Sequence, residues 1–215
     1  MMASIKGYFP VFAYQHDQTF FAQIAEGLEE LGAEEIRRLG AAAIRPSYCG
    51  LHFQSDPAAL YRINYQSRLV SRVLAPLVRF TCYDTDRLYR AARQVPWKAI
   101  MGVDQTLAVF ANVSNSHIRH SQYAALCLKD AIVDYFRNDC GRRPDVRRIN
   151  PDVWISLFIE NNRAVVSLDT SGGSLHRRGY RQEGVEAPMQ ETVAAAIIQW
   201  SEWDGIRPLV DPMCG

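Results

Sequence analysis

Residues 174–181 read SLHRRGYR, residues 186–198 read EAPMQETVAAAII, and residues 211–215 read DPMCG. Pro188 is placed to begin a helix, and the alanines that follow allow this helix to pack closely against a sheet, as an α/β domain requires. The apolar residues after Pro208 predict a strand that ends in a tight turn. In doubly wound α/β folds, ligands bind beyond the carboxyl ends of strands, where a glycine lets the backbone approach the ligand closely. These residues therefore predict the start of a ligand-binding α/β domain.

The segment before this region differs in composition. Residues 169–188 are polar, glycine-rich and basic, which predicts a linker. Two apolar runs precede it, residues 153–159 and 165–168, and the intervening Glu-Asn-Asn-Arg predicts a hairpin because asparagine tolerates a positive φ. Residues 121–137 predict the strongest helix of the chain. Together with a strand predicted at 73–82, a helix at 84–93 and a strand at 106–114, these elements indicate an α+β arrangement.

The first 70 residues predict a second, smaller α+β unit. We expect a strand at Tyr8–Tyr14 and then a helix whose apolar face carries Phe20, Ile24, Leu28 and Leu31 and which ends at Gly32. Residues 41–54 predict two short strands. Asp56 and Pro57 predict the start of a second helix that continues to Leu69.

The overall composition is that of a globular protein, and its cysteines are expected to be reduced thiols. Of 215 residues, 48% are hydrophobic and 22% charged, and no apolar run is long enough to cross a membrane. The N-terminus lacks the apolar stretch and cleavage site of a signal peptide, so we expect a cytoplasmic location. Five widely spaced cysteines form no C-x-x-C pair, which argues against a disulfide framework and a structural zinc site.

The net charge of +1 conceals an uneven distribution. Residues 1–60 carry a net −3, residues 61–150 a net +8, and residues 151–215 a net −4. Arginine supplies 13 of the 15 basic residues in the middle segment, and its planar guanidinium suits bidentate contacts to phosphate. This pattern favours a polyanionic partner. A solvated face with an accidental bias is the alternative that charge alone leaves open.

The stretches quoted above resemble a known family. SLHRRGYR followed by EAPMQETVAAA is similar to the junction that precedes the methyltransferase domain in THUMP-domain, class I SAM-dependent 23S rRNA (guanine-N2)-methyltransferases. Asp-Pro-x-Cys-Gly resembles the opening of their loop for S-adenosyl-L-methionine. Residues 113–134 and 142–154 resemble the core of the THUMP domain, which binds structured RNA. The resemblance covers most of the chain and is specific after Val113.

The resemblance implies a domain order. We expect a ferredoxin-like α+β domain at residues 1–70, a THUMP domain at 71–168, a linker at 169–188, and the first strand of a truncated Rossmann-like methyltransferase domain within 189–215. The implied full-length enzyme methylates the exocyclic N2 of a guanine in 23S rRNA. Its catalytic motif, [ND]-P-P-[YF], is absent from this sequence. We therefore expect this chain to be inactive alone and to contribute no catalytic residue.

The candidate site residues fall into two sets. The resemblance implies that the cofactor S-adenosyl-L-methionine is bound by Asp211, Pro212, Cys214, Gly215, Ala187 and Pro188. A polar loop that opens a helix offers amide groups and a positive dipole end to phosphate. We expect RNA contacts from that loop, from Lys129 and from the arginines after the helix: His117, Arg119, His120, Ser121, Gln122, Lys129, Arg142, Arg143, Arg147 and Arg148.

Three alternatives stay open from the residues. The chain could be a stand-alone RNA-binding protein of the THUMP type, or part of a DNA amino-methyltransferase that shares the same cofactor loop. His117 and His120 could bind a metal, but no carboxylate or cysteine lies next to them in sequence, so we expect no metal site.

Overall fold

The computed structural model describes residues 12–179 and 188–212. The chain folds as two compact units. The central unit contains residues 1–17 and 75–172, and the flanking unit contains residues 18–74 and 173–215.

The flanking unit is built on an antiparallel sheet with the order β2-β3-β1-β4. β1 pairs antiparallel with β3 on one side and with the first residues of β4 on the other. The β-α-β-β-α-β order is that of a ferredoxin-like domain, which confirms the predicted fold class. Its elements are β1 (Thr19–Gln23), α2 (Glu29–Arg38), β2 (Ala42–Ser47), β3 (Gly50–Gln54), α3 (Pro57–Gln66) and β4 (Arg72–Thr81), the last continuing into the central unit.

The first helix was predicted in the wrong place. Phe20, Ala22 and Ile24 are buried at a period of two, and the first two lie in β1. A spacing of four residues, as between Phe20 and Ile24, fits a strand as well as a helix, which explains the error. Gly32 does not end a helix but lies inside α2, where a side chain would overlap Ile24. The helix ends before Gly40, whose φ is +103°.

Two further boundaries differ from the prediction. Ala13 and Tyr14 were expected to end a strand, but they begin the short helix α1 (Ala13–Asp17). The rest of that predicted strand, up to Val11, lies outside the described residues. Asp56 caps α3 as expected by accepting a hydrogen bond from the Ala59 amide at 2.6 Å, but the helix ends at Gln66.

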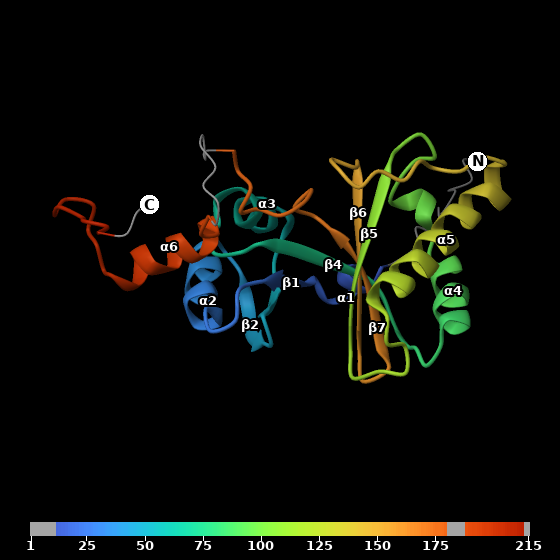
Figure 1. The fold of residues 1–215 in the computed structure, drawn as a ribbon, viewed down its shortest axis with the longest axis horizontal. Helices are drawn as coiled ribbons and strands as arrows, with labels where there is room; N and C mark the ends of the chain where they lie inside the picture. Colours follow the sequence, from blue (N-terminus) through green and yellow to red (C-terminus); the bar gives the residue numbers. More distant parts are fainter. Residues whose placement is uncertain (1–11, 180–187, 213–215) are drawn as a thin grey trace, which may run out of the picture. The chain divides into compact units, whose positions relative to one another are not determined.

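The central unit pairs a second sheet with two helices. Its strands follow the order β4-β7-β6-β5, with β5 parallel to β6 and β6 antiparallel to β7. Helices α4 and α5 lie together beside this sheet (Figure 1). The elements after β4 are α4 (Thr85–Arg93), the 3-10 turn η1 (Trp97–Ala99), β5 (Leu107–Ser114), α5 (Ser121–Cys140), β6 (Val153–Glu160) and β7 (Arg163–Asp169).

The core of the central unit fixes the ends of β5 and α5. Leu128, Ile132 and Phe136 of α5 are buried in one apolar cluster with Leu107 of β5. Before β5, the Asp152 carboxylate accepts hydrogen bonds from the amide and the hydroxyl of Thr106, both at 2.7 Å. These hydrogen bonds lower the pKa of Asp152 below its usual value of 3.8. This packing and these hydrogen bonds therefore hold β5 in place, and with it the loops that precede and follow this strand.

The flanking unit also contains α6 (Glu191–Trp200), which confirms the helix expected after Pro188. Ile197, Ile198 and Trp200 of this helix are exposed. Residues 208–212 were expected to form a strand, but none is formed there. A strand needs a neighbour for its backbone hydrogen bonds, and no described segment pairs with these residues. Within the described part of the chain, no helix has both the length and the hydropathy of a membrane span.

Candidate nucleic-acid interface

The loop between β5 and α5, together with the first turn of α5, holds five of the predicted RNA-binding residues. Ile118 is buried and anchors the loop in the core. His117, Arg119 and His120 are exposed on it. His120 is the N-cap of α5 but makes no side-chain capping hydrogen bond, and the first turn of the helix has no acidic residue. The start of α5 therefore offers amide donors and a positive dipole end beside basic side chains.

Two residues of the first turn have different roles. The Ser121 hydroxyl accepts a hydrogen bond from the Val113 amide at 3.1 Å, which ties the helix to β5. Gln122 is exposed and lies on the same turn. Of this pair, Gln122 is the residue with a side chain available to a ligand.

The β6–β7 hairpin holds the loop in place through Asn162. Its side-chain oxygen accepts a hydrogen bond from the His117 amide at 2.9 Å and lies 2.9 Å from His117 Nδ1. The backbone amide of Asn162 donates to the Ser116 hydroxyl at 3.0 Å, and its backbone carbonyl accepts a hydrogen bond from the Cys82 amide at 2.7 Å. Since the amide oxygen can only accept, Nδ1 of His117 carries the hydrogen, which leaves Nε2 for another partner. Asn162 thus connects three segments of the chain.

The hairpin has the backbone that the sequence predicted. Asn161 and Asn162 have φ values of +50° and +60°. The side chains of Asn161 and Asn115 are hydrogen-bonded to each other. The loop and the hairpin therefore form one surface, which we call the loop–hairpin surface: residues 115–122 and 161–163.

Two residues beside this surface were missed by the sequence analysis. The Tyr83 ring lies edge-on to the His117 ring, with 5.8 Å between ring centroids, and is half exposed. The guanidinium of Arg87 lies over the Tyr83 ring, 6.0 Å from its centroid. An exposed aromatic ring with an arginine beside it is a common element of nucleic-acid surfaces. No local pattern could have shown that Tyr83 lies near His117, 34 residues later.

The arginines after α5 lie far from the loop–hairpin surface. Gly141 ends the helix with a φ of +70°, and the chain then runs beside the start of β5, where the Arg147 amide donates to the Leu107 carbonyl at 3.0 Å. Helix α5 has 20 residues and rises about 28 Å over its length. Figure 1 shows the two loops at opposite ends of the unit. The structure therefore does not bring the two predicted basic groups together. The second group consists of Arg142, Arg143, Arg147 and Arg148, all exposed.

Two of the predicted basic residues already have acidic partners. Arg142 forms an ion pair with Asp104 at 2.6 Å. Lys129 lies in the middle of α5, forms an ion pair with Asp130, and has a side chain that is only 23% exposed. Lys129 is consequently less available to RNA than the loop residues are.

Two thiols of the central unit, those of Cys82 and Cys127, are in environments that do not favour the thiolate. Burial, with Asp84 nearby, raises the pKa of Cys82 to about 11. Burial also raises the pKa of Cys127 above its usual value. Both thiols are therefore protonated at neutral pH. Among the described residues there is also no group of three or more His, Cys, Asp or Glu side chains that could hold a metal.

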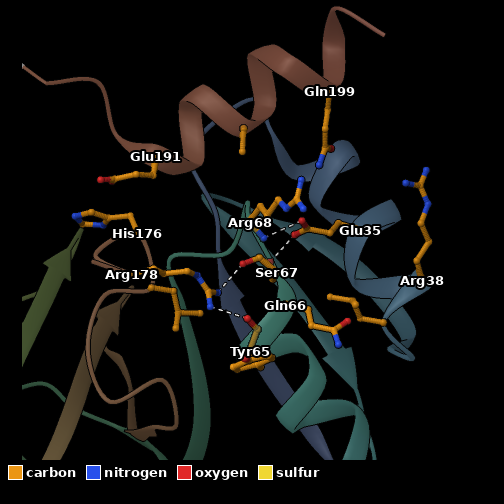
Figure 2. Close-up of a pocket in the computed structure, with 13 residues that line it drawn as sticks. Glu35, Arg38, Tyr65, Gln66, Ser67, Arg68, His176, Arg178, Glu191 and Gln199 are labelled. Carbon is orange, nitrogen blue, oxygen red and sulfur yellow. Dashed lines mark hydrogen bonds between the residues drawn. The ribbon is translucent and has the colours of Figure 1, made fainter. Parts of the chain in front are cut away.

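The segment expected to be a linker is attached to the flanking unit. Arg178 donates hydrogen bonds to the carbonyls of Tyr65, Asn64 and Ser67, at 2.7, 3.2 and 2.6 Å, at the C-terminal end of α3 (Figure 2). A cation is favourable there because the last carbonyls of a helix lack partners within it. The Leu175 amide also donates to a carbonyl of the flanking unit, that of Ser71.

The predicted cofactor residues are only partly described. Ala187, Cys214 and Gly215 lie outside the described residues. Asp211, Pro212 and Pro188 are exposed. These three described residues alone enclose no site for S-adenosyl-L-methionine.

Three segments of the chain match family models in order. Residues 19–74 match the RlmL ferredoxin-like domain, residues 82–169 match the THUMP domain, and residues 178–215 match the RMKL-like methyltransferase domain. Residues 82–169 of this chain are thus similar to THUMP domains. The family resemblance expected from the sequence is thereby confirmed, and the THUMP match falls on the central unit.

Known relatives are similar to more than nine-tenths of the chain. The chain is 46% identical over 200 residues to a ribosomal RNA large subunit methyltransferase K/L from Syntrophotalea carbinolica, of which it spans 28%. A solved structure described as a predicted N6-adenine-specific DNA methylase from Listeria monocytogenes is 28% identical, with a TM-score of 0.77. SMU.472, a putative methyltransferase solved in complex with SAH, is 27% identical, with a TM-score of 0.76. The chain covers 52% of each of these two structures.

Within the THUMP domain, the loop–hairpin surface is the best-formed candidate site. It combines exposed basic side chains and the open start of a long helix, with the Tyr83 ring beside them, and Asn162 holds the His117 backbone by a hydrogen bond. The second arginine group lacks such a framework beyond the Leu107 contacts. We therefore take the loop–hairpin surface as the primary candidate interface.

Proposed function

We propose that this chain is the RNA-recognition part of a SAM-dependent methyltransferase that acts on ribosomal RNA of the large subunit, the 23S rRNA. The observation that carries the proposal is the loop–hairpin surface of the THUMP domain, in a chain that also matches a methyltransferase domain model. The curated relative's name, a ribosomal RNA large subunit methyltransferase, supports the substrate. Such an enzyme works in the cytoplasm, where ribosomes are assembled.

The finer chemistry is part of the same proposal. The methyl group passes from S-adenosyl-L-methionine to the exocyclic N2 of a guanine, and the structure of a relative with bound SAH supports this cofactor. In the whole protein, Ala187, Pro188 and the Asp211–Gly215 stretch border the cofactor. The domain boundaries proposed from the sequence lie at residues 70, 168 and 188. The last two separate the RNA-binding domains from the domain that transfers the methyl group. The described chain alone is expected to transfer no methyl group.

RNA recognition by the loop–hairpin surface is tested by the salt dependence of binding. Binding of the chain to a 23S rRNA fragment is measured over a range of salt concentrations. If about six phosphates are contacted, the slope of log K against log [salt] is about −4 to −5. Arg119→Ala should make the slope less steep by about 1. Arg45→Ala, an exposed arginine on β2, is the matched control and should leave it unchanged. A flat salt dependence of wild-type binding contradicts the proposal.

The transfer reaction is tested on the full-length protein. It is incubated with labelled S-adenosyl-L-methionine and 23S rRNA, and the modified nucleoside is identified by mass spectrometry. N2-methylguanosine is the expected product. Label on another base would refute the guanine-N2 assignment but leave a methyltransferase.

Duplex DNA is the second candidate substrate. The Listeria relative, described as a predicted DNA methylase, supports it. Competition between the rRNA fragment and a DNA duplex of equal length separates the two. Preferential displacement by DNA would replace the RNA assignment.

A further inference from the structure

Helix α3 of the flanking unit exposes two tyrosines on one side. Tyr61 is 77% exposed and Tyr65 is 81% exposed. Residues four apart on a helix are neighbours, so the two rings stand next to each other along α3. Ala59 and Ile63 face the opposite way and are buried. The tyrosines are therefore not required for the packing of α3.

The surroundings of this pair are basic. Within the flanking unit, residues 57–74 contain three arginines, Arg62, Arg68 and Arg72, and no acidic residue. Tyr65 lines a hollow of about 850 Å³ together with Arg68, Arg38 and Arg178 (Figure 2). Tyr65 and these three lining arginines therefore lie around the same hollow, one helical turn from Tyr61.

The two carboxylates that line this hollow reduce its charge only in part. The Glu35 carboxylate accepts hydrogen bonds from the Ser67 hydroxyl and from the amides of Arg68 and Leu69, so it is directed into the turn after α3. The other carboxylate is that of Glu191. Arg178 is held by backbone carbonyls, and Arg38 forms an exposed ion pair with Glu34 at 3.3 Å. Arg68 is the arginine with the fewest competing contacts.

We infer that this surface, the Tyr61–Tyr65 platform with Arg68, is a second RNA contact that stacks unpaired bases. The inference rests on the proposed function, because it assumes that the chain binds RNA. Aromatic rings stack on any base, and arginine nearby contacts the phosphates. A protein partner fits less well, because the exposed large apolar residues of α3 are tyrosines alone, without aliphatic side chains. The charge complementarity with a polyanion favours RNA.

The experiment uses the 215-residue chain and two RNA probes, a hairpin with a single-stranded loop and a blunt duplex of equal length. The double variant Tyr61→Ala/Tyr65→Ala should weaken binding of the looped RNA by at least about fivefold, the effect of losing one stacked base. Binding of the duplex should not change. Tyr48→Ala is the matched control, because Tyr48 is 75% exposed but lies on the β2–β3 turn near Glu26. Tyr61→Phe/Tyr65→Phe keeps the rings and should keep the affinity.

Each outcome bears on one claim. If the Ala double variant binds both RNAs as the Tyr48→Ala control does, the platform inference is wrong, while the proposed function stands. An equal loss on loop and duplex also overturns it, because duplex bases are already stacked. If the variant binds RNA normally but changes the sedimentation of the protein, the platform is a protein interface instead. If wild-type chain binds neither RNA, the proposed function itself fails. Thermal unfolding by circular dichroism verifies that the variants fold.

Discussion

Asn162→Gly isolates the side chain that holds the candidate RNA-binding loop. Glycine accepts the φ of +60° at this position, so the substitution removes the two side-chain interactions with His117 without adding backbone strain. At about 1 kcal/mol for each hydrogen bond, the loop should open more easily by about 2 kcal/mol. Asn162→Ala removes the same interactions and also places a Cβ atom at a positive φ, which alanine tolerates less well than glycine. The alanine variant should therefore be less stable than the glycine variant by about 1 kcal/mol.

Hydrogen exchange at the His117 amide reports this change directly, because that amide is the donor to Asn162. A loss of 2 kcal/mol corresponds to exchange that is faster by about 30-fold. The amides of α6 lie in the other unit and serve as internal controls. RNA affinity should also fall, because a loop that is disordered in the free protein loses conformational entropy when it binds. Unchanged exchange at His117 in the glycine variant would refute the view that Asn162 orders the loop.

Three further predictions concern the framework. Arg178→Met removes the donor to three carbonyls of the α3 end and should make the segment after Asp169 more sensitive to a protease that does not cut at arginine, whereas Arg177→Met, which removes a side chain without a described partner, should not. Asp152→Asn should lower the stability of the central unit at neutral pH. The pKa of Asp152 is lower in the folded protein than in the unfolded chain, where it is near 3.8. The extra stability of the wild type is therefore fully present above pH 3.8 and is lost as the pH falls through the lower pKa of the folded state. Below that pH, urea unfolding should no longer distinguish the two proteins. Gly32→Ala should destabilise the flanking unit by about 1–3 kcal/mol, because the new methyl group overlaps Ile24, and a normal urea midpoint would contradict the tight packing.

The sequence predicted well wherever one local signal sufficed. The Asp56 cap, the helices α4 and α5 and the Asn161–Asn162 hairpin all follow from short patterns, and each is present in the structure. The ferredoxin-like order was also predicted, although its first strand and helix were placed several residues too early. The apolar spacing around Phe20 fits both periods, so only the pairing of β1 with β3 and β4 decides it.

The candidate site was harder to predict because its residues come from distant segments. The sequence supplied His117 and its neighbours, but Tyr83, Arg87 and Asn162 join them only through the fold. Charge counting, in turn, could not tell how far the Arg142–Arg148 group lies from the loop, because both lie in the basic middle segment. The length of α5 separates them, which a count along the chain cannot show.

That separation constrains the partner. The loop–hairpin surface and the Arg142–Arg148 group lie at opposite ends of α5, a helix with a rise of about 28 Å. A short single strand bound at one end leaves the other group unused, whereas a folded RNA of that size can contact both through its phosphates. Such contacts depend on the shape of the RNA and not on its base sequence. The arrangement of charge in the THUMP domain therefore favours an extended, structured RNA. The tyrosines of α3, which contact bases and not phosphates, would then be the part of the chain suited to an unpaired loop.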